Sequence, residues 1–202
     1  MLASSYPEEA LNMYTTQGKK LYEFVCSELD KLSGSLIELG CGKGRFALHY
    51  ADRHPTDKVY GIDLAENNLK IARLRAKLMN YSHVRFIQGD VTKPLPYRHF
   101  SNIICIETIE HLPDLGTFVQ NIKTILNRGG TFILTTPHEL RCTRDGGYIK
   151  PNHYLQSFGI TDKYFHSGYT LPELKILFQS KDFEIVKSIV ALSKSVLILK
   201  RL

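Results

Sequence analysis

The chain has 202 residues, of which 43% are hydrophobic and 23% are charged, a composition typical of a globular domain and not of a disordered chain. The length suits one α/β domain, and we expect residues 1–202 to form a single domain. The formal net charge of +6 favours anionic partners, nucleic acid among them, without excluding small-molecule enzymes. No apolar run approaches the roughly 18 residues of a membrane span, so we expect none.

The cysteines give no sign of a zinc or redox motif. They are Cys26, Cys41, Cys105 and Cys142, and no two of them have the C-x-x-C spacing of zinc ribbons and dithiol centres. We read Cys41 and Cys105 as buried, reduced thiols, which are typical of the cytosol. Residues 1–9 lack the apolar run of a signal peptide. These features predict a cytoplasmic protein.

Hydrophobic periodicity predicts alternating helices and strands along most of the chain. Residues 10–33 have helical spacing, and we expect Gly18 to separate a lid-like segment, 1–18, from the helix proper. Strands are expected at 36–39, 58–63, 84–88, 101–106 and 131–135. Helices are expected at 45–54, 67–80 and 115–126, the last of them stopped by the Asn-Arg-Gly-Gly sequence at 127–130.

The last third of the chain has a different character. Residues 137–169 are rich in Gly, His and Tyr and have little helical period, so we interpret them as a functional loop region. A helix is expected at 170–181, followed by strands at 183–189 and 195–199 that form a hairpin. Together the elements predict an α/β fold with a seven-stranded, mostly parallel sheet, helices on both faces and a C-terminal antiparallel hairpin.

A glycine-rich turn, Gly40-Cys-Gly-Lys-Gly44, follows the first expected strand. Glycine permits positive φ and close backbone approach, and the helix start behind it offers unpaired N–H groups. We therefore expect a ligand at this turn. Such a turn alone does not separate nicotinamide cofactors from other nucleosides, but the acidic Glu38 in front of it does not suit a pyrophosphate.

Polar or acidic residues lie at the end of each of the first five predicted strands. In an open α/β sheet, ligands bind at the carboxyl ends of the strands. Asp63 lies about 20 residues beyond the glycine turn, a spacing that suits an acceptor for ribose hydroxyls. Acidic groups at these ends favour a ligand with hydroxyls, an amino group and a positive centre but no phosphate. S-adenosylmethionine is such a molecule. The residues at the five ends are Glu38, Asp63, Asp90, Glu107 and Thr136.

Five motifs, taken together, resemble those of class I S-adenosylmethionine-dependent methyltransferases over about residues 20–200. They are Glu38-Leu-Gly-Cys-Gly-Lys-Gly44, Gly61-Ile-Asp63, Gln88-Gly-Asp90, Ile106-Glu-Thr-Ile-Glu-His-Leu112 and Leu126-Asn-Arg-Gly-Gly-Thr-Phe132. The resemblance implies a Rossmann-like fold with S-adenosyl-L-methionine as cofactor. It places Glu38 and the glycines at the methionine moiety, Asp63 at the ribose, Asp90 at the adenine and Glu107 near the sulfonium. The implied cofactor-binding residues are Glu38, Gly40, Cys41, Gly42, Asp63, Leu64, Asp90, Val91 and Glu107.

The acceptor is indicated by the segment Glu107-Thr-Ile-Glu110-His111, which has the form E-x-x-E-H. It resembles small-molecule O- and N-methyltransferases, quinone-biosynthesis types among them. It also resembles small-RNA 3′-terminal 2′-O-methyltransferases, in which both Glu, the His and a later His bind a divalent metal. The sequence around His166 lacks the Glu-Trp of the RNA branch. We therefore expect a small-molecule acceptor and no metal.

A hydroxyl acceptor must lose a proton, which a His of near-neutral pKa can take. We predict that His111, with Glu110, does this, and that His138, Tyr164 and His166 shape an acceptor pocket formed by residues 1–18 and 137–169. Three other hypotheses stay open at this stage. They are metal-dependent methylation of RNA ends, a non-catalytic module of the same fold, and a nicotinamide dehydrogenase.

Overall fold

The computed structural model of the protein describes residues 16–112, 115–138, 169–178, 182–192 and 194–202. Within these ranges no helix has the length and apolar character needed to cross a bilayer. The elements are α2 (Thr16–Leu29), β1 (Leu36–Leu39), α3 (Arg45–Arg53), β2 (Val59–Asp63), α4 (Glu66–Leu78), β3 (Val84–Gln88), β4 (Phe100–Ile106), the 3₁₀ helix η1 (Ile109–His111), α5 (Leu115–Ile125), β5 (Leu126–Pro137), α7 (Leu171–Phe178), β6 (Phe183–Ala191) and β7 (Lys194–Arg201).

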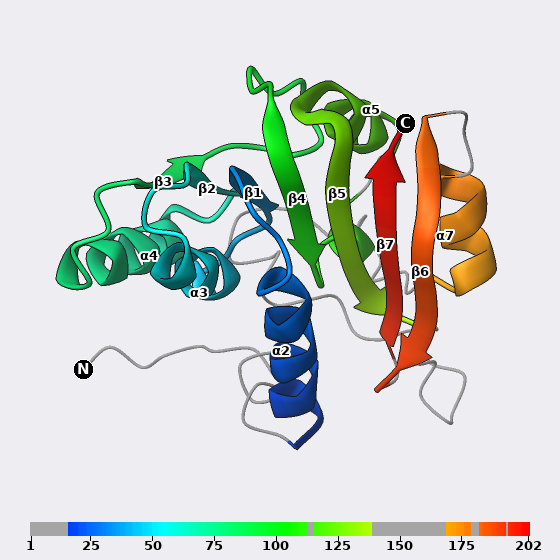
Figure 1. Ribbon diagram of the computed structural model, residues 1–202, viewed down its shortest axis with the longest axis horizontal. Coiled ribbons are helices and arrows are strands. Elements are labelled where there is room, and N and C mark those ends of the chain that lie inside the picture. The colour runs from blue at the N-terminus through cyan, green and yellow to red at the C-terminus, as the bar shows by residue number, and fades with distance from the viewer. Residues whose placement is uncertain (1–15, 113–114, 139–168, 179–181, 193) are drawn as a thin grey trace.

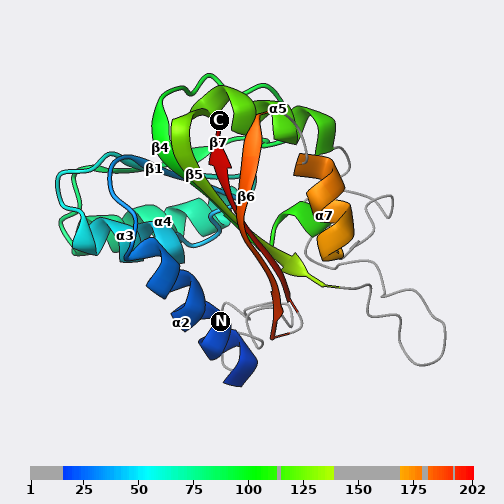
Figure 2. The same cartoon turned by 45° about the vertical axis from the view of Figure 1, so that its right-hand side comes forward.

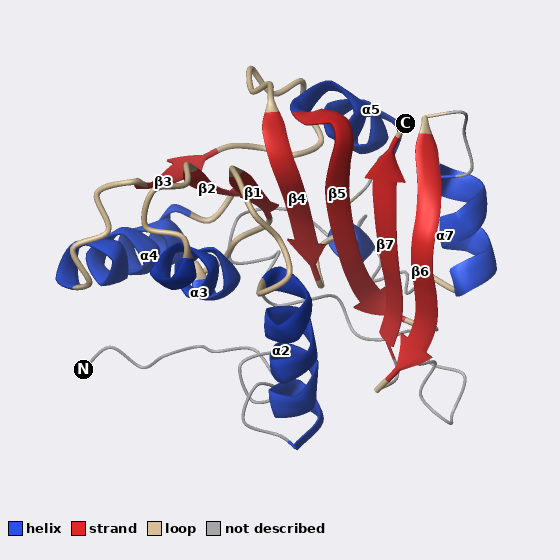
Figure 3. Ribbon diagram, in the orientation of Figure 1, coloured by secondary structure: helices blue, strands red, loops and turns tan. Residues whose placement is uncertain are grey.

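The strands form one seven-stranded sheet in the order β3-β2-β1-β4-β5-β7-β6 (Figure 3). The strands from β3 to β5 are parallel to their neighbours, whereas β7 runs antiparallel to both β5 and β6. The predicted fold class and the C-terminal hairpin are thus confirmed. The chain moves outward from β1 to β3 and then returns to β4 on the other side of β1, which makes the β1–β4 boundary the switch point where such sheets bind ligands.

Helices cover both faces of the sheet (Figures 1 and 2). Apolar side chains of α2, α3 and α4 share one buried cluster, and those of α5 and α7 share the other. The separation follows from the strand geometry, because successive side chains point to opposite faces. Leu36 packs in the α2–α4 cluster, and its neighbour Ile37 packs in the α5–α7 cluster. Strands buried on both sides in this way need the almost continuous apolar sequence seen in β4.

The first helix differs from the prediction at both ends. It runs through Gly18, so this glycine does not separate a lid from the helix, and it ends at Leu29 instead of residue 33. Residues 1–15 of the expected lid lie outside the described residues. A glycine inside a helix costs only about 1 kcal/mol relative to alanine. The burial of Val25 and Leu29 on this helix outweighs such a cost.

The Asn-Arg-Gly-Gly segment at 127–130 does follow the end of a helix, but it lies within the bounds of β5. Leu126 pairs with Phe100, and the next pair joins Thr131 to Asn102. One residue of β4 therefore faces four residues of β5, which form a bulge with Gly129 at φ 74°. The strand begins earlier than predicted because Leu126 already pairs with β4.

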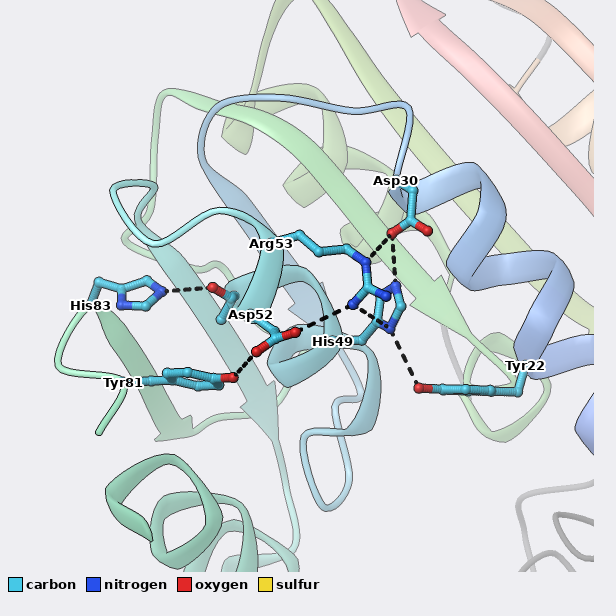
Figure 4. Close-up of polar contacts among 8 residues, drawn as sticks. Tyr22, Asp30, His49, Asp52, Arg53, Tyr81 and His83 are labelled. Carbon is cyan, nitrogen blue, oxygen red and sulfur yellow. Dashed lines mark hydrogen bonds and ion pairs between the residues drawn. The ribbon is translucent and has the colours of Figure 1, made fainter. Parts of the chain in front are cut away.

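Polar contacts fix the outer side of α3, the helix that begins at the glycine turn. The oxygen Oδ1 of Asp30 lies 2.9 Å from Nε2 of His49 and 3.0 Å from Nε of Arg53. Figure 4 shows the network that links Tyr22, Asp30, His49, Arg53, Asp52 and Tyr81, beside which Nε2 of His83 lies 3.3 Å from the carbonyl oxygen of Ala51. Exposed ion pairs contribute only about 0–1 kcal/mol each. We infer that these contacts position α3 between α2 and the segment before β3 more than they stabilise the fold.

Candidate functional site

The carboxyl ends of β1 to β5 lie along one edge of the sheet because these strands are parallel neighbours. The antiparallel β7 contributes its first residues to the same edge, where Ser195 pairs with Thr136 and Lys194 pairs with Pro137. Sequence reasoning missed Lys194 and Ser195. The signal for them was the predicted hairpin, since an antiparallel last strand must begin where the parallel strands end.

The glycines of the turn after β1 have different roles. Gly40 has φ 77°, and a Cβ there would lie 2.3 Å from the Oγ1 atom of Thr108. Gly40 is thus required by the close packing of the segment after β4. Gly42 has φ 50°, and a Cβ at this position would meet no atom within 4 Å. Gly42 is therefore the position of the turn where the backbone borders open space, as a ligand-binding loop requires.

Glu38 is a buried carboxyl group at the end of β1, with only 2% of its surface exposed. Its Oε2 accepts a hydrogen bond from the backbone N–H of Ala47, 2.9 Å away in the first turn of α3. The pKa of Glu38 is raised to about 8, because burial, helped by the Asp63 charge, raises it more than the Ala47 hydrogen bond lowers it. The side chain is therefore mainly protonated at neutral pH until a cation approaches it.

Asp63 joins the glycine turn to the segment after β2. Its Oδ2 accepts from the N–H of Gly42 at 2.7 Å, and its Oδ1 accepts from the N–H of Ala65 at 2.8 Å. Burial raises the pKa of Asp63, while these backbone bonds lower it. An ionised carboxylate has about four acceptor positions. Asp63 can thus hold both backbone groups and still accept from ligand hydroxyls.

The residues expected around the adenine lie at the ends of β2 and β3. Leu64, directly after Asp63, has 46% of its surface exposed and offers an apolar surface at this edge. The Oδ1 of Asp90 accepts from both the N–H and the hydroxyl of Thr92, at 2.9 and 2.6 Å. These bonds fix the turn that presents the Asp90 carboxylate. The side chain of Val91 belongs to the buried core, so it supports this turn from below.

The thiol of Cys41 packs in the hydrophobic cluster of the α2–α4 face. Burial, followed by the charges of Glu38 and Asp63, raises its pKa well above the usual range, and burial does the same for Cys105. Both thiols stay protonated, and both are buried as predicted. Cys41 can therefore serve a ligand through its backbone only, since its sulfur faces the core.

Glu107 follows β4 with φ 51°, in the left-handed region. Its Oε1 accepts from the hydroxyl of Thr135, 2.9 Å away on β5, and its Oε2 forms an ion pair with Lys194 on β7. The carboxylate is thus turned toward β5 and β7. The structure brings it to the same edge as the glycine turn, but to the side on which β5 and β7 lie.

Glu110 and His111 lie together in η1. Glu110 is buried, and its Oε2 accepts from the hydroxyl of Thr136 at 3.1 Å. Its Oε1 lies 3.9 Å from Nε2 of His111. Burial and then the Glu107 charge raise the pKa of Glu110, with His111 and Lys194 acting in the opposite direction. The pair combines an imidazole with a buried carboxyl group that can orient it.

His138, at the end of β5, is held by a short chain of hydrogen bonds. The hydroxyl of Ser195 donates to the carbonyl oxygen of Tyr169 at 2.6 Å, and the same Oγ lies 2.7 Å from Nδ1 of His138. A serine hydroxyl has one hydrogen, and Tyr169 receives it. Oγ must therefore accept from His138, so Nδ1 is protonated and Nε2 of the neutral ring has the lone pair. Such an imidazole can take a proton at Nε2.

The metal hypothesis requires a later His, and His166 lies outside the described residues. No group of three or more His, Cys, Asp or Glu side chains in them is placed to hold an ion. Lys194 also pairs with Glu107, one of the two carboxylates that the metal hypothesis requires. Tyr164 and His166 of the expected acceptor pocket lie outside the described residues, as do 139–168 in general.

A hollow lies at the opposite edge of the sheet, near the starts of β4 and β5. It has a volume of about 310 Å³, and its lining includes Lys31, Asn102, Arg128 and Lys200 but no acidic residue. It lacks the carboxylates that would accept from hydroxyl and ammonium groups. The carboxyl edge is therefore the candidate functional site.

Comparison with known proteins shows the family and the fold of this chain. A family model described as a methyltransferase domain matches residues 31–161, more than half of the chain. A solved S-adenosylmethionine-dependent methyltransferase of Clostridium acetobutylicum matches with a TM-score of 0.70 and 11% identity. The match covers 96% of this chain and 95% of that one, and it shows a shared fold.

Two curated relatives are similar in sequence. One is a fatty-acid O-methyltransferase of Mycolicibacterium smegmatis, 27% identical over 128 residues, which are 63% of this chain and 44% of that protein. The other is a ubiquinone biosynthesis O-methyltransferase of Leptothrix cholodnii, 32% identical over 109 residues, which are 52% of this chain and 46% of that protein. The chain spans less than half the length of either relative.

Proposed function

This chain belongs to the methyltransferase-domain family, and on that premise we propose that it transfers a methyl group from S-adenosyl-L-methionine to an oxygen or nitrogen of a small molecule. The observation that carries the proposal is the position of the buried Glu38 next to a turn whose Gly42 borders open space. Asp63 holds this turn by accepting a hydrogen bond from the Gly42 N–H, and its charge acts on Glu38. This arrangement suits a cofactor with an ammonium group and ribose hydroxyls.

The residues at the carboxyl edge fit the cofactor part by part. Glu38 would ionise and pair with the ammonium group, and Asp63 would accept from the ribose hydroxyls. Asp90 would accept from the adenine amino group, with the apolar surface of Leu64 close by. The cofactor supplies an electrophilic methyl group on a sulfonium. The absence of a side chain at Gly42 would let the ligand approach the backbone.

Methyl transfer is an in-line displacement, so positioning of the acceptor contributes most of the rate gain. A hydroxyl acceptor must also lose its proton. Two imidazoles at the β4–β5 side of the edge could accept it: His111, next to the buried Glu110, and His138, whose Nε2 has the lone pair. Relatives named as O-methyltransferases and N-methyltransferases support a small-molecule acceptor at either atom.

Calorimetric titration with S-adenosylhomocysteine tests the cofactor site directly. We expect the wild-type protein to bind it and the Asp63→Asn variant to bind about 100-fold less tightly. One or two charge-assisted hydrogen bonds, each of about 1.5–3 kcal/mol, would be weakened. Glu23→Gln, on the exposed side of α2, is the matched control and should bind as the wild type does. Undiminished binding by Asp63→Asn, or none by the wild type, contradicts the proposed site.

The acceptor class requires a second assay. The protein is incubated with labelled S-adenosylmethionine and panels of small carboxylic acids, phenols, amines and RNA oligonucleotides. We expect label in a small molecule, with no effect of a chelator. Chelator-sensitive label in RNA only would instead support methylation of RNA ends.

A further inference from the structure

The helix α4 has apolar side chains on the side that faces away from the sheet. Leu74 is 56% exposed and Leu78 is 73% exposed. With 3.6 residues per turn, Leu74 and Leu78 lie one above the other, and the half-buried Ile71 continues their row. The opposite side of the helix supplies the core with Leu69, Ala72 and Ala76. The fold uses only one of the two apolar sides of α4.

Basic side chains flank this outward row. Lys70 and Lys77 are exposed and lie seven residues apart, on one flank. Arg75 is on the other flank, where its Nη1 donates to the carbonyl oxygen of Lys43 at 3.4 Å. Burial, followed by the Arg75 charge, lowers the pKa of Lys43. The α4 outer face, as we call it, consists of Lys70, Ile71, Leu74, Arg75, Lys77 and Leu78.

Ordinary structural roles explain only part of this face. Cations in the last turn stabilise a helix by 0.3–1 kcal/mol, roughly, through its dipole, which accounts for Arg75 and Lys77. Arg73 has a separate role, because its Nη1 pairs with Glu66 at 2.6 Å. Single exposed apolar residues are common. Neither argument explains why Ile71, Leu74 and Leu78 form one row between cations.

The size of the face favours a lipid surface over a protein partner. The 13 residues of α4 make a helix about 20 Å long and about 10 Å wide, a footprint of about 200 Å². A stable protein interface buries about 800 Å² on each partner. A bilayer needs no matching shape. It accepts apolar side chains at the headgroup boundary and attracts cations to anionic lipids.

We propose that the α4 outer face docks the protein on an anionic lipid bilayer. In Figure 1, α4 is the outermost helix at the β3 end of the molecule. None of the residues of the face belongs to the candidate site. Docking is therefore separate from methyl transfer, and either proposal can fail without the other. Docking would bring the enzyme to the surface where apolar acceptors accumulate.

Co-sedimentation with vesicles tests the proposal. We expect binding to vesicles of phosphatidylglycerol and phosphatidylcholine, none to phosphatidylcholine alone, and weaker binding as salt increases. Lys70→Gln with Lys77→Gln should lower the partition coefficient about 25-fold, since each cation near an anionic surface is worth about fivefold. Leu74→Gln with Leu78→Gln should lower it at least about tenfold, because the inserted apolar area is lost.

Matched controls separate this face from the general positive charge of the chain, which is +6. Ile176→Gln changes a residue on α7 that is as exposed as Leu78, at 73%. Lys19→Gln with Lys20→Gln removes two cations from α2. Both controls should bind anionic vesicles within about twofold of the wild type. S-adenosylhomocysteine binding and the urea midpoint should be unchanged in the α4 variants, which checks their folding.

A fluorescence measurement gives an independent readout. The chain has no tryptophan, so Leu78→Trp introduces a single indole at the exposed C-terminal end of the face. Its emission should shift to the blue with anionic vesicles, and an indole at Ile176→Trp should not respond. Equal losses in the α4 and α2 charge variants, no wild-type vesicle binding, or binding of an RNA oligonucleotide or acidic peptide by this face in place of vesicles would each overturn the proposal.

Discussion

At the residue scale, the imidazole of His138 is restricted to one tautomer by two neighbours. Ser195 connects it to the carbonyl oxygen of Tyr169, and only the form protonated at Nδ1 completes both bonds. We predict that nitrogen-15 NMR, at a pH where the ring is neutral, shows a protonated Nδ1 and an unprotonated Nε2. Ser195→Ala should remove this preference and mix the two tautomers. A wild-type ring protonated at Nε2 contradicts the assignment.

Single residues also show what the sequence could predict about the site. Glu38 and Asp63 lie in the last two residues of β1 and β2, and Asp90 follows β3 by two residues, so local sequence was enough to place them at one edge. Lys194 and Ser195 reach that edge only because β7 inserts between β5 and β6. That arrangement depends on pairing between strands that are far apart in the sequence, and hydrophobic periodicity does not reveal which strands pair. The ion pair of Lys194 with Glu107 was unpredictable for the same reason.

At the element scale, two glycines of the turn between β1 and α3 have different roles. Gly40 allows close packing against Thr108, and Gly42 leaves space for a ligand. Gly40→Ala should lower the free energy of unfolding by about 3 kcal/mol, because the new Cβ would overlap Thr108 at an unfavourable φ. Gly42→Ala should cost only about 1 kcal/mol, for φ strain in open space. Urea denaturation measures both values.

Ligand binding should be weakened by the substitution at Gly42, although that substitution costs little stability. Folded Gly42→Ala should bind S-adenosylhomocysteine at least about tenfold more weakly, because its methyl group occupies the space beside the turn; tenfold corresponds to about 1.4 kcal/mol. If Gly42→Ala binds like the wild type, the open space at this position is not part of the cofactor site.

The bounds of some elements could be predicted from the pattern of apolar and turn residues alone. The bounds of β1 and β3 were predicted to the residue, since turn residues limit two short apolar segments. The start of β5 was not, because Leu126 joins the sheet through its pairing with Phe100 before the glycine bulge. The continuation of α2 through Gly18 was also missed, since helix packing decides it and glycine propensity does not.

At the scale of the whole molecule, the carboxyl edge makes stability depend on pH. The folded-state pKa of Glu38 is about 8, above the value of about 4.3 in an unfolded chain. The folded protein therefore holds a proton that the unfolded chain releases between these values. The stabilisation that this bound proton gives to the folded protein is complete below about pH 4.3 and is lost as the pH rises toward 8. Asp63 and Glu110, whose pKa values are also raised, act in the same direction.

Glu38→Gln isolates this effect, since the glutamine can still accept from the Ala47 N–H and does not ionise. Relative to the wild type, we expect its free energy of unfolding to increase by about 2–4 kcal/mol between pH 5.5 and pH 8.5, from about 1.4 kcal/mol per pH unit for one proton. Urea denaturation at several pH values measures the difference. A constant difference across this range would show that Glu38 ionises normally. With S-adenosylmethionine present the trend should weaken for the wild type, because an ammonium group beside Glu38 stabilises its charged form and lowers its pKa.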